Sequence, residues 1–229
     1  WRCILSNPET LIVHHLEYSR SHRVLWLLEE MGQPYQVKRY PRNSSWLAPK
    51  ELRDVHPLGK SPVLTLDDRT LAESGAILES LVEENPDCGL GIAPGEPGRS
   101  DYLYWLHYAE GSLMPLMVMT VVFRKIPQGK MPFFIRPIAR MISQKAVETF
   151  LKPQVTTHLK VLNDWLEGRD WIAGDKLTAA DIQMSFPLEA AARRFGLDAY
   201  PALQRYLERL RARPAYQRAL EKGGPMTPA

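Results

Sequence analysis

The sequence predicts two structural parts, a small α/β domain over residues 11–85 and an all-helical domain over residues 99–229, and three observations support this prediction. Short β-rich runs alternate with helical runs from residue 11 to about residue 84, which is the pattern of an α/β unit. Residues 86–98 contain three prolines and four glycines, which is typical of a linker between domains. Beyond this linker the apolar residues recur every three or four positions, as they do on helices.

The α/β part begins with a predicted strand over residues 11–16 and a helix that ends at Gly32. The apolar face of this helix consists of Val24, Leu27, Leu28 and Met31. A second strand over 35–40, a short helix over 49–54 and a third strand over 61–66 are expected next. Residues 69–72 should pair antiparallel with the third strand, and Ser74 should cap the last helix of this part. The apolar face of that last helix consists of Ile77, Leu78, Leu81 and Val82.

The helical part has two periodic segments and one helix-start motif. The first segment has apolar residues from Val147 to Leu166, with a bend predicted at Pro153, and the second runs from Leu203 to Leu210. The residues TAAD at 178–181 form a capping box, so Asp181 is interpreted as a helix cap rather than a catalytic group. No internal repeat is present in the sequence.

Composition and charge exclude several classes of protein. The 29 Lys and Arg residues against 26 Asp and Glu residues leave a net charge of +3, far below that of a dedicated nucleic-acid binder. The two cysteines, Cys3 and Cys88, have no CxxC spacing, so we expect neither a zinc site nor a secreted disulfide framework, and a cytoplasmic location fits best.

No membrane partner is expected either. The most apolar stretch, residues 113–123, stops well short of the ~20 residues that a membrane-spanning helix needs. Residues 1–10 lack the pattern of a signal peptide and are interpreted as an extension that precedes the fold.

Three local patterns suggest a ligand site, although each has a plain structural interpretation. Ser61 and Pro62 open the third strand, where a proline removes a ladder donor and leaves the backbone able to face a ligand. Glu73 and Ser74 precede a helix, whose first N–H groups and dipole attract an anionic group. The polar run YSRSHR at 18–23 lies at the first strand–helix turn. Their combination points to a site between these three segments.

Four segments, taken together, resemble the glutathione S-transferase family. They are YSRSHRVLWLLEEMGQPY at 18–35, HPLGKSPVL at 56–64, LAESGAIL at 71–78 and LTAADI at 177–182, in the family's order and spacing. The resemblance covers about residues 11–222 and is strongest toward the bacterial and fungal enzymes related to the theta class. It implies an N-terminal thioredoxin-like domain, a C-terminal all-helical domain and a cytosolic homodimer.

The resemblance also implies how glutathione would bind as co-substrate. Glu73 and Ser74 match the residues that hold its γ-glutamyl end, where the serine and the helix N-terminus bind the α-carboxylate and the glutamate answers the α-ammonium group. Ser61, before a cis Pro62, matches the residue whose backbone pairs with the cysteinyl part. Lys60 matches a cation near the glycyl end, but the preceding segment, residues 46–50, has no clean match to the family's other glycyl-end ligands.

The resemblance assigns thiol activation to Ser19, and two alternatives remain open. A hydrogen bond from a hydroxyl to a thiolate is worth about 1.5–3 kcal/mol, which lowers a thiol pKa by about one to two units from its usual value near 8.5. Ser21 would serve if the turn is set differently, and Tyr18 would serve if this chain uses tyrosine chemistry. A cysteine mechanism is excluded at this turn because residues 18–23 contain no cysteine.

Other polar and flexible residues are interpreted as structural. His14 and His15 are adjacent in a strand and so point to opposite faces, which argues against a shared metal, and no metal site is predicted. Met114, Met117 and Met119 fill a core or line a permissive pocket.

Residues 111–147 contain six cations and no Asp or Glu, mixed with apolar residues. This segment predicts a solvated face or, given the family's fold, a wide apolar pocket with a cationic rim over the glutathione sulfur. The cations are Arg124, Lys125, Lys130, Arg136, Arg140 and Lys145.

The function that these patterns favour is a glutathione transferase without a bound cofactor. It would activate the glutathione thiol for conjugation to small apolar electrophiles and could also reduce hydroperoxides. The alternative is a non-catalytic binding or scaffold protein with the same fold, because a fold does not prove an activity.

Overall fold

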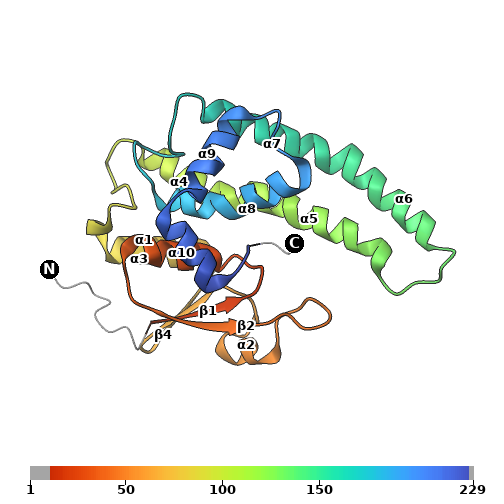
Figure 1. Cartoon of the computed structure of the whole chain (residues 1–229), viewed down its shortest axis with the longest axis horizontal. Helices are drawn as coiled ribbons and strands as arrows, with labels where there is room; N and C mark the ends of the chain where they lie inside the picture. The colour runs from red at the N-terminus through yellow and green to blue at the C-terminus, as the bar shows by residue number, and fades with distance from the viewer. Residues whose placement is uncertain (1–10, 227–229) are drawn as a thin grey trace.

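The computed structural model describes residues 11–226, and the interpretation of residues 1–10 as an extension lies outside this range. The chain forms a sheet layer with its own helices, followed by a group of helices stacked above it (Figure 1). The elements are β1 (Leu11–Leu16), α1 (His22–Met31), β2 (Gln36–Tyr40), α2 (Lys50–Val55), β3 (Val63–Leu66), β4 (Arg69–Ala72) and α3 (Ser74–Glu84), then the 3₁₀ turn η1 (Pro86–Cys88).

The four strands form one mixed sheet in the order β2-β1-β3-β4. β1 pairs with β2 in parallel, while β3 pairs antiparallel with both β1 and β4. Because β1 is central, its side chains are shielded on both faces, and five of its six residues are buried. The strand over 69–72 pairs antiparallel with the third strand, as the sequence predicts.

The helical region contains α4 (Arg99–Tyr108), α5 (Met114–Lys125), α6 (Arg136–Ala146), α7 (Lys152–Trp165), α8 (Ala179–Phe195), α9 (Pro201–Arg211) and α10 (Pro214–Gly223). π-helical turns join two pairs of these helices, η2 (Ala109–Leu113) before α5 and η4 (Val147–Leu151) before α7, and the 3₁₀ turn η3 (Ile126–Gln128) follows α5. Pro115 and Pro153 each lie in the first turn after a π turn. A proline has no N–H and its ring clashes with a carbonyl of the preceding turn, which is why a bend is predicted at Pro153. The wider π turn gives the proline the space that a regular α-helical turn does not.

Helix α8 lies at the centre of the molecule, because twelve of its seventeen residues are buried and it packs on α1, α3, α4 and α9. The predicted capping box starts this helix. Asp181 accepts hydrogen bonds from the Thr178 N–H at 2.8 Å, the Ile172 N–H at 2.8 Å and the Tyr206 hydroxyl at 2.8 Å. Asp181 is therefore a structural cap, although burial raises the pKa of its carboxyl group.

Helices α4 and α5 and their turns make one continuous helix over Arg99–Gln128, which is long and apolar enough to span a membrane by length and composition. The sequence pattern places only residues 113–123 in an apolar run, because it does not reveal that η2 joins the two helices. Trp105, Leu106 and Leu113 of this helix are buried in the core, and 39% of its apolar window is buried inside the molecule. Helices α5 and α6 form a hairpin that projects away from the rest of the molecule (Figure 1).

Candidate functional site

A cavity of about 360 Å³ lies where the β1–α1 turn, the start of β3 and the start of α3 meet. The structure brings most of the predicted site residues together there. Its walls include Tyr18, Ser19, Lys60, Ser61, Pro62, Glu73 and Ser74. Ser21, the alternative to Ser19, is completely buried and does not line this cavity.

The turn before α1 places Ser19 at the cavity wall. Tyr18 adopts a left-handed backbone with φ of 52°, which sends the chain sharply out of β1. The Ser19 Oγ lies 2.7 Å from the Ser21 Oγ and accepts a hydrogen bond from the Ser21 N–H at 3.3 Å. The two contacts fix the position of the Ser19 hydroxyl. The residue is only 7% exposed, and it lines the cavity.

The Ser61–Pro62 peptide bond is cis, as the resemblance implies. The Ser61 hydroxyl donates to the His14 carbonyl at 2.8 Å and accepts from the Leu16 N–H at 3.1 Å. Since both bonds are to β1, this side chain fastens the loop before β3 to the centre of the sheet. The backbone at Ser61 and Pro62 then lines the cavity.

The start of α3 differs from the prediction that Ser74 caps this helix. Glu73 is the N-cap residue, with φ of 70°, and Ser74 is the first helical residue. The Ser74 Oγ instead accepts two side-chain hydrogen bonds, from Arg23 Nη1 at 3.1 Å and from Gln183 Nε2 at 3.1 Å. The prediction failed because both donors come from distant helices. The φ of 70° at Glu73 is unusual for a residue other than glycine and costs about 1–3 kcal/mol, and such strained residues are common at binding sites.

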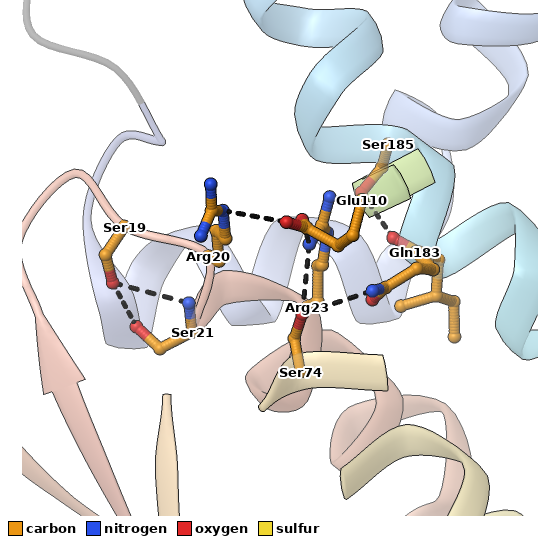
Figure 2. A network of polar contacts seen from close by, with 9 residues as sticks. Ser19, Arg20, Ser21, Arg23, Ser74, Glu110, Gln183 and Ser185 are labelled. Atoms are coloured by element: carbon orange, nitrogen blue, oxygen red, sulfur yellow. Dashed lines mark hydrogen bonds and ion pairs between the residues drawn. The ribbon is translucent and has the colours of Figure 1, made fainter. Parts of the chain in front are cut away.

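A polar network supports Ser74 from behind, with Arg23 and Gln183 buried and with Glu110 and Arg20 partly exposed (Figure 2). Glu110 forms ion pairs with both Arg23 and Arg20, the second at 3.3 Å. Burial lowers the pKa of the Arg23 guanidinium to about 10, so this side chain is still charged at neutral pH. The sequence signal for this network was Arg23, which precedes the buried apolar residues of α1, and the predicted site did not include it. Its partners in η2 and α8 could not be found from the sequence.

Arg42 is a second residue that the sequence reasoning missed. Its guanidinium donates to the carbonyls of Glu17 at 2.9 Å, Trp46 at 2.8 Å and Tyr18 at 3.2 Å. It thereby ties the loop before α2 to the β1–α1 turn, and the Tyr18 and Trp46 rings meet at 5.8 Å. Trp46, Leu47 and Ala48, which had no clean match to a known ligand, form one wall of the cavity.

The helical region contributes Met114 and Phe186 to the cavity. Of the acid-free segment 111–147, Met114 is the residue that lines this cavity, and none of the six cations of this segment lines it. Lys125 approaches the cavity from outside, with its Nζ 5.2 Å from the centre of the Trp46 ring. Arg124 and Arg140 line a separate cavity between α5 and α6. Met117 is buried and Met119 partly buried in the core, as the structural interpretation of the methionines predicts.

The two histidines of β1 have separate partners on opposite faces. The His14 Nδ1 lies 2.8 Å from the Tyr40 hydroxyl, and the His15 ring bridges the Gly223 carbonyl and the Ser21 hydroxyl, each at 2.8 Å. Within residues 11–226 no group of three or more His, Cys, Asp or Glu side chains is arranged to hold a metal ion.

Comparisons with known proteins agree with this geometry. The model of the glutathione S-transferase N-terminal domain matches residues 19–84, and that of the C-terminal domain matches residues 113–214. Glutathione S-transferase 1 of Saccharomyces cerevisiae is 32% identical over 223 residues, which cover 92% of this chain and 94% of the yeast protein.

Two solved structures have the same fold as this chain. A glutathione S-transferase from Actinobacillus pleuropneumoniae has a TM-score of 0.78 at 34% identity, with 93% of this chain and 92% of the other covered. A sphingomonad glutathione S-transferase complexed with glutathione has a TM-score of 0.73 at 26% identity, with 93% and 98% covered. The predicted thioredoxin-like domain followed by an all-helical domain is thus confirmed, and the chain belongs to the glutathione S-transferase family of enzymes.

Proposed function

We propose that this protein binds glutathione in the cavity beside Ser19 and activates its thiol for conjugation to small apolar electrophiles. The observation that carries the proposal is the convergence of the Ser19 hydroxyl, the cis Ser61–Pro62 bond and the Glu73–Ser74 pair on one cavity. The sphingomonad relative, which is complexed with glutathione, supports the choice of ligand.

The γ-glutamyl end would bind at the start of α3. Both lone pairs of the Ser74 Oγ are occupied by Arg23 and Gln183, so its own hydrogen is available to a carboxylate in the cavity. The N-terminus of α3 and the buried charge of Arg23 also favour an anion there. Glu73 is exposed at the same position and would bind the α-ammonium group.

The rest of the tripeptide would extend along the start of β3. The backbone at Ser61 would pair with the cysteinyl part as an added strand does. Lys60 would meet the glycyl carboxylate, with the wall at Trp46 to Ala48, which Arg42 fixes, on the other side. This arrangement leaves the sulfur near the β1–α1 turn.

Thiol activation would come from Ser19 and the N-terminus of α1. The hydroxyl would donate a hydrogen bond to the thiolate, worth about 1.5–3 kcal/mol, and the helix dipole would add about 0.3–1 kcal/mol. Ser21 has no access to the cavity, which favours Ser19 or Tyr18 for this role. The theta-like subtype stays a prediction.

The electrophile would lie above the sulfur, between the two domains. The side chains there are mostly apolar, with Leu58, Met114 and Phe186 from three separate elements. This supports an apolar second substrate, and organic hydroperoxides would fit the same space. The flexible side chain of Met114 would let the pocket accept substrates of different shape.

A homodimer and a cytoplasmic location, both typical of the family, are proposed for this chain as well, with glutathione as co-substrate rather than a bound cofactor. The hairpin of α5 and α6 exposes several large apolar side chains, including Phe133 at 83% and Phe134 at 64%. A second subunit would cover such a surface.

The experiment is a steady-state assay of the purified protein with glutathione and a panel of neutral aromatic electrophiles and organic hydroperoxides. We expect glutathione-dependent turnover with at least one member. Tight glutathione binding without turnover on any of them would favour the non-catalytic binding protein instead.

A further inference from the structure

Ser19 is the last member of a buried hydrogen-bond chain that begins in the C-terminal helix α10. The carbonyl oxygen of Gly223 lies 2.8 Å from His15 Nε2, and His15 Nδ1 lies 2.8 Å from the Ser21 Oγ. The Ser21 Oγ in turn lies 2.7 Å from the Ser19 Oγ. His15 and Ser21 are 2% and 0% exposed, so water cannot replace a partner within this chain.

The carbonyl end determines the direction of every bond in the chain. A carbonyl oxygen only accepts, so His15 Nε2 must carry a hydrogen. The pKa of His15 is lowered to about 4, mainly by burial and also by Arg39 on β2, although the Gly223 carbonyl and Glu17 act in the opposite direction. His22 on α1 also interacts with this ring, and burial lowers its pKa to about 3, so it is neutral at neutral pH. At neutral pH the His15 ring therefore has one hydrogen, and its Nδ1 is an acceptor.

The Ser21 hydroxyl therefore donates its single hydrogen to His15 Nδ1. The Ser21 Oγ can then only accept from Ser19, because two hydroxyl oxygens 2.7 Å apart need a hydrogen between them. Ser61 is a weaker partner for Ser19, since its Oγ is 3.4 Å away and its own hydrogen is donated to the His14 carbonyl. In the free protein the hydrogen of Ser19 thus points away from the cavity and toward Ser21.

We propose that His15 and Ser21 are positioning residues that compete with the glutathione sulfur for the single hydrogen of Ser19, and so limit how acidic the bound thiol becomes. This inference rests on the proposed function. Ser19 can donate to the thiolate only by leaving Ser21, whose oxygen then loses its donor. The strength of thiol activation is therefore set partly by a carbonyl group from α10, a helix that contributes no residue to the cavity.

A proton relay through the same atoms is the other chemistry that this chain suggests. In that case the thiol proton would pass to the Ser19 oxygen as the Ser19 and Ser21 hydrogens move along one place, and His15 would become doubly protonated. A free thiol has a pKa of about 8.5, and that of His15 is about 4, so the transfer would be opposed by a factor of roughly ten thousand. Competition for the hydrogen is therefore the stronger effect.

The test is Ser21→Ala, followed by the ultraviolet absorbance of bound glutathione thiolate and by kcat, each as a function of pH. Removing the competitor should lower the pKa of the bound thiol by about 0.7, which is about fivefold more thiolate on the acidic side, because one neutral hydrogen bond no longer opposes donation. The kcat profile should shift toward lower pH by the same amount, with KM for glutathione nearly unchanged. His15→Phe, which frees the Ser21 hydrogen for donation to Ser19, should shift the profile in the same direction.

The matched control is Ser185→Ala, which removes another fully buried hydroxyl, one that donates to the Ile182 carbonyl within α8. This control should keep the wild-type profile. A higher thiol pKa in Ser21→Ala, or an unchanged one, would overturn the proposal, because Ser21 would then assist Ser19 or have no effect on it. The wild-type arm tests the proposed function separately, since a wild-type protein with no thiolate signal on adding glutathione would overturn that function itself.

Discussion

Replacing Ser74 by alanine should reduce both stability and glutathione affinity, because this hydroxyl faces the core and the cavity at once. The substitution removes the acceptor of two buried donors. Arg23 Nη1 keeps its ion pair with Glu110, but Gln183 Nε2 has no other partner within the described part of the chain. One orphaned buried donor costs about 1–3 kcal/mol and the second lost hydrogen bond about 1 kcal/mol. We expect the free energy of unfolding to fall by roughly 2–4 kcal/mol.

The effect on binding has a different origin. The lost hydrogen bond from the Ser74 hydroxyl to a glutathione carboxylate is worth about 1.5–3 kcal/mol, which is roughly a 10- to 100-fold increase in Kd. Two single substitutions separate the two effects. Glu73→Gln should weaken binding with little loss of stability, since Glu73 is exposed. Gln183→Leu should leave the Ser74 hydroxyl available to the ligand.

The assays are urea unfolding and titration calorimetry with glutathione on these three variants and on the double variant Ser74→Ala with Gln183→Leu. Because the leucine has no donor to orphan, the stability cost of Ser74→Ala should be smaller by about 1–3 kcal/mol in the double variant. An equal cost in both backgrounds would refute the assignment of the network. Wild-type affinity in both Ser74→Ala and Glu73→Gln would refute the γ-glutamyl site.

Three further substitutions, one of them with a control variant, test other parts of the molecule. Ser19→Ala should lower kcat at least tenfold and raise the pKa of the bound thiol, with a smaller effect on KM, and an unchanged pH–rate profile would move the role to Tyr18. Lys125→Gln should reduce the preference for a carboxylated electrophile over its neutral analogue at low ionic strength, because Lys125 contacts the Trp46 wall of the cavity. Lys130→Gln should not, because Lys130 lies on the same hairpin but makes no cation–π contact with Trp46 in the described part of the chain, and equal effects of both substitutions would remove any role of Lys125 in selection. Burial lowers the pKa of His22 to about 3, below its unfolded value near 6.5, so the unfolded chain binds the extra proton and stability falls as the pH drops below 6.5. His22→Phe should remove roughly 2 kcal/mol of the stability difference between pH 6.5 and 4.5, as measured by urea unfolding, and the same difference in both proteins would show that His22 is not neutral in the fold.

Local patterns in the sequence were sufficient for the order and type of the elements around the site. The apolar spacing of α1 and its end at Gly32, the antiparallel pairing of β3 with β4 and the capping box of α8 all depend on residues within a few positions of one another. Local patterns also pointed to the segments of the site, while the resemblance to the family selected Ser19 and Lys60 within them. Ser19, Ser61 and Glu73 each occupy a strand–helix or loop–strand junction, and the strand order of the sheet brings such junctions to one edge.

The tertiary structure decided what those side chains do. Ser74 accepts hydrogen bonds from α1 and α8, rather than capping its own helix, because Arg23 and Gln183 come from elements far away in the sequence. The cations of residues 111–147 lie on a projecting hairpin and beside a second cavity, because the direction of a helix depends on its packing and not on its own residues. Ser21 and His15 acquire their connection to Ser19 through a carbonyl group 208 residues beyond His15. Secondary structure is encoded by neighbours along the chain, whereas the direction of a hydrogen bond and the pKa of a buried ring depend on groups that only folding brings together.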